Sequence, residues 1–586
     1  MKSVIACFIG FFCFVALPDN APSGGPGPVN PVFIKWRDMN AADREVAFNG
    51  LVPSPTDMQP AELTTKVRLL KTVSSPMLPC RFDPRESGRL VTVRNQGTDG
   101  TCWAHAGIAT LEFNMMKGEG REIDFSESHL ANNHGYDYPG WSYGNSDMVQ
   151  AYLLRWEGPV LEAYEKYPSK GIKKVIPPAR HVQRVCHVAP KTSPLDNDSI
   201  KQAVMKYGAL SVAYYHNDYY YSYQHKSYHC PKKDDTTHLV AIVGWDDNYP
   251  KEHFVNQPSG NGAYIVRNSW GDEWGDGGYF YVSYYDAVFG SWRMYAFVAD
   301  EYPDNYGCVY QHDTYGFTGT WGWNGPSGWG ANMFTAQKDE KIAAVGFYAL
   351  SPNTSYIIRV YTNCQYGNPS SGTLQIEQSG MRSEAGYDTI RLDKAISVKK
   401  LTRFSVVIYV DSPGLQYPLA LEWRTKGYTE NVTASEGESF RGTDGISWYD
   451  FVDNGCNFCV KAYTELLSPV QKTSARTAFV PYSWIDDYPE ILTSCDGDYE
   501  KAAAFVMPNH CPLFRAYVAM LDPYVEDSDF KVFITMSNNV PCISWTPSYL
   551  QKRVYRIWGK ATLGADEQWS PTNSCHRFFK VSAEVP

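Results

Sequence analysis

The sequence has little positive charge. Its 586 residues include 53 Lys and Arg against 63 Asp and Glu, a net charge of −10 with a pI near 5.8. That balance argues against nucleic acid as a partner. The 14 cysteines are scattered without a repeat and predict neither a disulfide framework nor a zinc site. No spaced ligand set follows Asp246-Asp247-Asn248, so we expect a solvated turn there rather than a calcium site, and neither a metal nor a cofactor overall.

Long apolar runs are also scarce. The run from Val4 to Leu17 follows Lys2 and is too short to cross a membrane comfortably. It predicts a signal peptide at residues 1–17, a secreted or cell-surface protein, and no transmembrane anchor. Residues 18–77 begin rich in Pro and Gly and read as a leader, either a prosegment or a strap packed on the next domain.

The length predicts several domains, because one hydrophobic core rarely serves so long a chain. Helical periodicity dominates after residue 78, with helices expected at about 103–117, 127–132, 147–156 and 197–207. Buried strands are expected at 209–215, 239–245, 263–270 and 278–285. Residues 78–300 thus form an α+β unit, in which a helical lobe and a β lobe meet at a cleft.

One polar turn leads directly into the first of these helices and ends at Cys102. Free backbone N–H groups and the helix dipole at such a position favour a thiolate, which is the nucleophilic form of cysteine. The competing interpretation is a buried structural cysteine, which is the commoner fate of a free thiol.

Two buried strands carry polar residues at their ends. His238 opens the first, and Asn268 directly follows the second. A nucleophilic cysteine needs a base within hydrogen-bond reach and a third group that orients the base. Gln96 lies six positions before Cys102, where its amide could stabilise an oxyanion beside the Cys102 N–H.

The pattern Gln-Gly-x-x-Gly-x-Cys-Trp-Ala, a histidine in an apolar strand, and Asn-Ser-Trp-Gly-x-x-Trp-Gly resembles the papain-like cysteine proteases across about residues 78–300. The resemblance implies a two-lobed papain-like fold that acts on proteins or peptides. By it Cys102 is the nucleophile, His238 the general base and acid, Asn268 the orienting residue and Gln96 the oxyanion donor. Trp270 would cover the His–Asn hydrogen bond.

The same resemblance places Trp103, Tyr143, Gly144 and Trp270 at the substrate-binding cleft. Tyr143-Gly144 stands where the family often has a Gly-Gly pair, so Tyr143 is expected to narrow the cleft. The family's bridged cysteines are replaced by Asp99 and Asn133, the pattern expected when a disulfide has been lost.

Residues 301–466 change to short alternating strands separated by Gly, Pro, Ser and Asn, which is typical of an all-β sandwich. They resemble the lectin-like domain that follows the peptidase in some secreted prokaryotic papain-like proteins, which implies binding of surface carbohydrate. Trp321, Trp323 and Trp329 could stack on sugars or pack in the core. Residues 467–586 are expected to form a C-terminal β-rich α+β module, with a helix at 499–521 followed by strands.

The sequence therefore predicts a secreted cysteine endopeptidase with appended β-rich modules. One alternative is a surface adhesin with a secondary or vestigial peptidase domain, which glycan binding by residues 301–466 would favour. Another is a thiol transferase that uses the same groups to join chains, which product analysis with an added amine would detect.

Overall fold

The structure, a computed structural model, describes residues 24–56 and 78–466, except 121, 172, 174, 300, 302 and 304. It also gives the backbone of C-terminal strands, which are β24 (Lys531–Ser537), β25 (Val540–Thr546), β26 (Val554–Lys560), β27 (Ser570–Pro571) and β28 (Phe578–Glu584). The expected signal peptide and the expected helix at 499–521 lie outside the described residues. Within the described part, no helix combines the length and apolarity needed to cross a bilayer.

The helices of the first domain lie where periodicity predicts them. They are α3 (Cys102–Glu119), α4 (Glu127–Asn133), α5 (Ser146–Leu154) and α6 (Asp198–Tyr207). Helix α3 extends two residues beyond the predicted 117, through Gly118 to Glu119, because an isolated glycine is tolerated inside a helix. The helix ends at Gly120, whose φ of 70° provides the left-handed cap.

The β lobe packs against α3 through small and apolar side chains, among them Ala109 and Phe113 of the helix and Val243 of the sheet. Its strands are β2 (Arg81–Phe82), β3 (Arg184–Val188), β4 (Leu210–Tyr214), β5 (Tyr221–Ser222), β6 (Ser227–Tyr228), β7 (His238–Asp246), β8 (Ala263–Arg267), β9 (Tyr279–Ser283) and β10 (Met294–Val298). The short 3₁₀ helices are η1 (Pro84–Ser87), η2 (Asp218–Tyr220), η3 (Lys251–His253) and η4 (Val452–Asn454).

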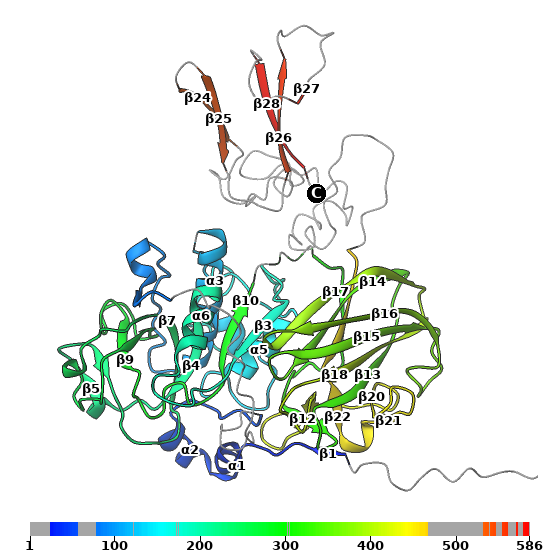
Figure 1. Cartoon of the computed structure of the whole chain (residues 1–586), viewed down its shortest axis with the longest axis horizontal. Coiled ribbons are helices and arrows are strands. Elements are labelled where there is room, and N and C mark those ends of the chain that lie inside the picture. The colour runs from blue at the N-terminus through cyan, green and yellow to red at the C-terminus, as the bar shows by residue number, and fades with distance from the viewer. Residues whose placement is uncertain are drawn as a thin grey trace, which may run out of the picture.

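The second domain is the β-sandwich that the sequence predicts (Figure 1). Its strands are β11 (Val309–Tyr310), β12 (Gly319–Gly322), β13 (Ser327–Thr335), β14 (Glu340–Ala349), β15 (Thr354–Thr362), β16 (Thr373–Arg382), β17 (Ala385–Val398), β18 (Arg403–Asp411), β19 (Leu419–Trp423), β20 (Ser439–Gly442), β21 (Tyr449–Asp450), β22 (Cys456–Phe458) and β23 (Val460–Thr464). Buried aliphatic and aromatic side chains fill the space between its sheets, including Phe347, Ile358 and Val406.

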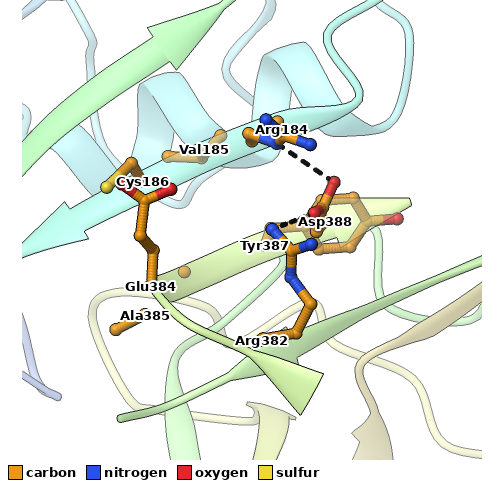
Figure 2. A pocket seen from close by; sticks show the side chains of 9 residues that line it. Arg184, Val185, Cys186, Arg382, Glu384, Ala385, Tyr387 and Asp388 are labelled. Atoms are coloured by element: carbon orange, nitrogen blue, oxygen red, sulfur yellow. Dashed lines mark hydrogen bonds and ion pairs between the residues drawn. The ribbon is translucent and has the colours of Figure 1, made fainter. Parts of the chain in front are cut away.

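The two domains share one continuous sheet. Its strand order is β11-β23-β14-β17-β3-β10-β4-β7-β8-β9-β6-β5, with β2 also paired to β7. The domains meet where β17 runs antiparallel to β3, with Gly386 opposite Cys186. Figure 2 shows this seam, where Arg184 and Arg382 both pair with Asp388. The hollow beside them holds about 10 Å³, too little for a ligand, so we interpret the cluster as structural.

The leader contains two short helices that periodicity did not reveal. They are α1 (Pro31–Asp38) and α2 (Ala41–Phe48), each started by an asparagine whose side chain accepts a backbone N–H bond. Ahead of them, β1 (Gly25–Pro26) pairs with β12 of the second domain. In Figure 1 the leader lies along the lower edge of both domains. It is therefore attached to both.

The seam predicts the effect of Gly386→Ala. Gly386 has a φ of +124°, and a Cβ there would lie 2.0 Å from the Val185 carbonyl oxygen. We expect destabilisation by about 2–3 kcal/mol, measured by thermal denaturation, because the strands cannot separate locally without breaking their ladder. Gly367→Ala is the matched control, since its φ is +76° but nothing lies within 4 Å. It should cost only about 1 kcal/mol, and equal effects of the two substitutions would contradict the prediction.

Candidate active site

The candidate nucleophile begins a helix at the junction of the two lobes. Cys102 is the first residue of α3 and is only 1% exposed. The backbone groups of Leu239 in β7 and of Trp103 lie near the thiol and act to lower its pKa. Because Leu239 directly follows His238, these contacts bring the thiol of one lobe to the histidine of the other.

The histidine is fixed by an amide on the neighbouring strand. Strands β7 and β8 are antiparallel, with Ala241 opposite Arg267, so the start of β7 and the end of β8 lie side by side. There the His238 Nε2 lies 2.8 Å from the Asn268 Oδ1. An amide oxygen can only accept, so Nε2 carries the proton and Nδ1 is the nitrogen left to take a proton from a thiol.

Aromatic rings shield the His–Asn pair from water. Trp270 stacks on His238, with ring centroids 4.9 Å apart. Tyr214 meets the same imidazole edge-on at 5.7 Å. Tyr214 ends β4, one of the strands that the sequence predicts. A hydrogen bond in so dry a setting is electrostatically stronger than one in water.

The Gln96 amide is held in a defined orientation. Its Oε1 accepts from the Ser269 hydroxyl at 2.6 Å, and its Nε2 donates to the Asp99 carbonyl at 2.7 Å. One N–H of the amide remains for another acceptor. The Gln96 backbone N–H also bonds the Ser269 carbonyl at 2.8 Å, which ties the turn before Cys102 to the loop after Asn268. The structure thus brings together all four predicted catalytic candidates.

Burial suppresses ionisation of both reacting groups. It raises the pKa of the Cys102 thiol to about 11, although backbone N–H bonds partly oppose the shift. It lowers the pKa of His238 to about 3, against the opposing effect of the Asn268 hydrogen bond. At neutral pH the covered site therefore holds a thiol and an imidazole rather than an ion pair.

The leader occupies the cleft at Gly144. Leu51 forms a parallel bridge with Gly144, the Val52 N–H donates to the Gly144 carbonyl at 2.9 Å, and the Gly144 N–H donates to the Gly50 carbonyl at 3.1 Å. A predicted substrate-binding position thus binds extended backbone of the chain itself. Tyr143 lies beside it and donates to Glu45 of α2 at 2.7 Å.

Trp103 supports Gly144 from behind. Its ring is fully buried, its Nε1 donates to the Gly140 carbonyl at 2.9 Å, and a Cβ on Gly144 would lie 2.2 Å from it. A role in positioning the glycine fits this geometry better than direct contact with a ligand.

A small cavity of about 40 Å³ lies next to the leader. Asp147 and Leu239 line it, and the leader residue Ser54 donates its hydroxyl to Asp147. The Tyr295 hydroxyl donates to the same carboxylate at 2.7 Å. Sequence reasoning missed Asp147, which no motif marks.

The two aspartates of the predicted turn at 246–248 form ion pairs with basic side chains: Asp246 pairs with Arg81, and Asp247 pairs with Lys201. Across residues 24–56 and 78–466, as far as they are described, no three His, Cys, Asp or Glu side chains gather in a way that could hold a metal.

Comparison with known proteins assigns both domains. Residues 78–292 match the papain family cysteine protease, and residues 309–464 match the lectin-like domain. The chain therefore joins a papain-family cysteine protease domain to a lectin-like domain.

The same pair of domains occurs in a solved structure, that of the cysteine protease and lectin-like domains of Cwp84, a surface layer associated protein of Clostridium difficile. It is 25% identical with a TM-score of 0.64, and the match covers 75% of this chain and 98% of that one. A Clostridial Cwp84 structure after propeptide cleavage is 27% identical with a TM-score of 0.59, covering 66% and 98%.

A cysteine protease of Blomia tropicalis is 30% identical over 232 residues, which are 37% of this chain and 64% of that protein. The match spans between 56% and 64% of the length of the first three curated relatives.

The raised pKa of the Cys102 thiol predicts how fast it reacts with iodoacetamide in the full chain, with the leader still attached. Only the thiolate reacts, so the rate should rise about tenfold per pH unit between pH 7 and pH 10, below the thiol's pKa of about 11. Peptide mass mapping measures it, with the exposed Cys80 as internal control. A rate that levels off below pH 8 would contradict the prediction.

Proposed function

We propose that this protein is a cysteine endopeptidase that hydrolyses protein or peptide substrates through Cys102, His238, Asn268 and Gln96. The observation that carries the proposal is the His238–Asn268 hydrogen bond of 2.8 Å. It fixes the imidazole with Nδ1 free, at the start of a strand whose next residue, Leu239, lies near the Cys102 thiol and acts to lower its pKa.

The reaction follows from these groups. The His238 Nδ1 takes the thiol proton, and the Cys102 sulfur attacks the peptide carbonyl carbon. The oxyanion that forms accepts from the Cys102 N–H and the remaining Gln96 N–H. The C–N bond breaks as the imidazolium gives its proton to the leaving amine. Water, deprotonated by His238, then releases the acid from the acyl-enzyme, and the thiol regains its proton.

We infer that residues 24–56 are an inhibitory prosegment. Their backbone pairs with Gly144 in the cleft, and in the chain that carries them Cys102 and His238 are only 1% and 2% exposed. At Leu51 the leader backbone runs in the same direction as the backbone at Gly144. The solved relative described as propeptide-cleaved matches a smaller share of this chain, 66% against 75%, which is consistent with a leader that is removed.

The proposed location is outside the cell or on its surface. The apolar run at 4–17 supports it, as does the likeness to a surface layer associated protein. The match of residues 309–464 to the lectin-like domain supports surface carbohydrate as a second partner. Trp321 and Trp329 lend no support to it, because they are 5% and 8% exposed and pack in hydrophobic clusters.

The proposed chemistry predicts a graded set of variants. After leader removal, Cys102→Ala and His238→Ala should abolish hydrolysis of a peptide substrate. Gln96→Ala should lower kcat by about 10²–10³-fold with little change in KM, because its N–H acts on the oxyanion rather than on the ground state. Cys80→Ala and His225→Ala are matched controls and should retain activity. Normal turnover by Cys102→Ala would refute the proposal, and a product joined to an added amine would favour transfer over hydrolysis.

The inhibitory role predicts that Gly50→Ala opens the site. Gly50 has a φ of +89°, and a Cβ there would lie 3.0 Å from Gly100 Cα and 3.1 Å from the Ser142 carbonyl oxygen. A weakened leader should let a peptide-like epoxide label Cys102 in the uncut chain about tenfold faster. Gly25→Ala, in the same leader but with nothing within 4 Å, should leave the rate unchanged. Equal rates for the two variants would count against inhibition by this segment.

A further inference from the structure

A loop of the lectin-like domain reaches the cleft of the peptidase domain. Tyr428 lies on the turn after β19, where its carbonyl accepts from the Asp137 N–H at 3.2 Å. Its hydroxyl accepts from the Asn145 side chain at 3.0 Å. Asn145 directly follows Gly144 and caps α5. The second domain therefore holds the segment that carries the cleft glycine.

Hydrogen bonds within the loop and to the peptidase domain hold the loop in place. The Thr429 hydroxyl donates to the Trp423 carbonyl at 2.6 Å, and the Gly427 N–H donates to Glu430 at 2.7 Å. Asp137 of the peptidase domain accepts from the Glu430 N–H and, at 2.6 Å, from the Asn431 side chain. These bonds hold the loop that carries Tyr428 against the peptidase domain, and none of them involves the leader.

Tyr428 completes an aromatic surface, which we call the aromatic shelf and define as Tyr136, Tyr138 and Tyr428. The Tyr428 ring meets Tyr136 edge-on at 5.0 Å and stacks on Tyr138 at 5.9 Å. Two of these side chains come from the peptidase domain and one from the lectin-like domain. The shelf exists only because the two domains are joined.

Bulky aromatic side chains of the leader occupy the shelf. Phe33 meets the Tyr428 ring edge-on at 5.1 Å, and Trp36 meets Tyr138 at 5.7 Å. Both leader side chains are at most 1% exposed. Helix α1, which carries them, starts at Asn30, whose side chain donates to the Ser54 carbonyl at 2.9 Å. Helix α1 therefore begins close to the leader segment that pairs with Gly144, since Ser54 lies two residues after Val52.

We propose that, once the leader is gone, the aromatic shelf is a substrate subsite for an aromatic side chain near the cleaved bond, and that Tyr428 of the lectin-like domain determines this preference. The proposal rests on the proposed peptidase function. Its chemistry is that of edge-on and stacked ring contacts, which add to the burial of apolar area and which small side chains cannot make.

The test uses the full chain with a site-specific protease site placed between residues 57 and 77, cut before assay. Peptides carry Phe or Ala in turn at each position on either side of the cleaved bond. We expect one position at which Phe raises kcat/KM about tenfold over Ala. In Tyr428→Ala that ratio should fall to about two, whereas Tyr428→Phe, which keeps the ring, should retain it.

Tyr449→Ala is the matched control, because Tyr449 is an exposed tyrosine of the same domain. It should leave both rates unchanged. An unchanged Phe-to-Ala ratio in Tyr428→Ala overturns the proposal, including the case in which both rates fall equally, because Tyr428 would then act only as a support for Asn145.

A second measurement uses the cut protein without any substitution in it and does not depend on catalysis. A fluorescent peptide of residues 24–56 is bound to the cut protein and displaced by the same unlabelled peptide with or without Phe33→Ala. Phe33→Ala should weaken displacement about tenfold, and equal potency overturns the proposal. If no peptide is hydrolysed, the proposed function fails, whereas this displacement still reports on the shelf.

Discussion

The pairing of β3 with β17 is the constraint on which the rest of the arrangement depends. It joins the peptidase sheet to the sandwich in one hydrogen-bonded ladder, with Gly386 allowing the closest approach. A flexible linker would let the domains reorient, whereas a shared sheet fixes their geometry. Because the orientation is fixed, a loop such as the one that carries Tyr428 can form part of the cleft, and one leader can be anchored on both domains at once.

Under the proposed function, the leader suppresses the chemistry through solvation as well as through steric exclusion. With water excluded, the thiol of Cys102 and the imidazole of His238 are both held in their neutral forms. Moving a proton between them would create two charges in a dry environment, which is unfavourable without further stabilisation. Departure of the leader would return water to one side of the pair. The Asn268 hydrogen bond would then favour the imidazolium, as it already opposes the effect of burial.

The catalytic candidates could be predicted from sequence because three of them stand at the start or end of a helix or strand that local periodicity reveals. Cys102 starts a helix, and His238 and Asn268 stand at the ends of buried strands. The leader helices were missed because each has only eight residues, too few for a clear period, although Asn30-Pro31 and Asn40 are recognisable start signals. The shared sheet and the position of Tyr428 depend on pairings between distant segments, and no single-sequence pattern reports such pairings.

The absent disulfide shows how local contacts replace a covalent bond. Asp99 and Asn133 stand at the two bridge positions, and every cysteine in the described part of the chain is free. Asp99 pairs with Lys170, but that lysine is half exposed, so the ion pair itself adds little. Trp141 does more, because it stacks on Tyr167 at 5.3 Å and donates to Asn132 at 2.7 Å. The Tyr167 hydroxyl in turn donates to the Gln96 carbonyl at 2.9 Å. The turn that carries the proposed oxyanion donor is thus held by a half-buried aromatic contact and hydrogen bonds, which need no oxidising environment to form.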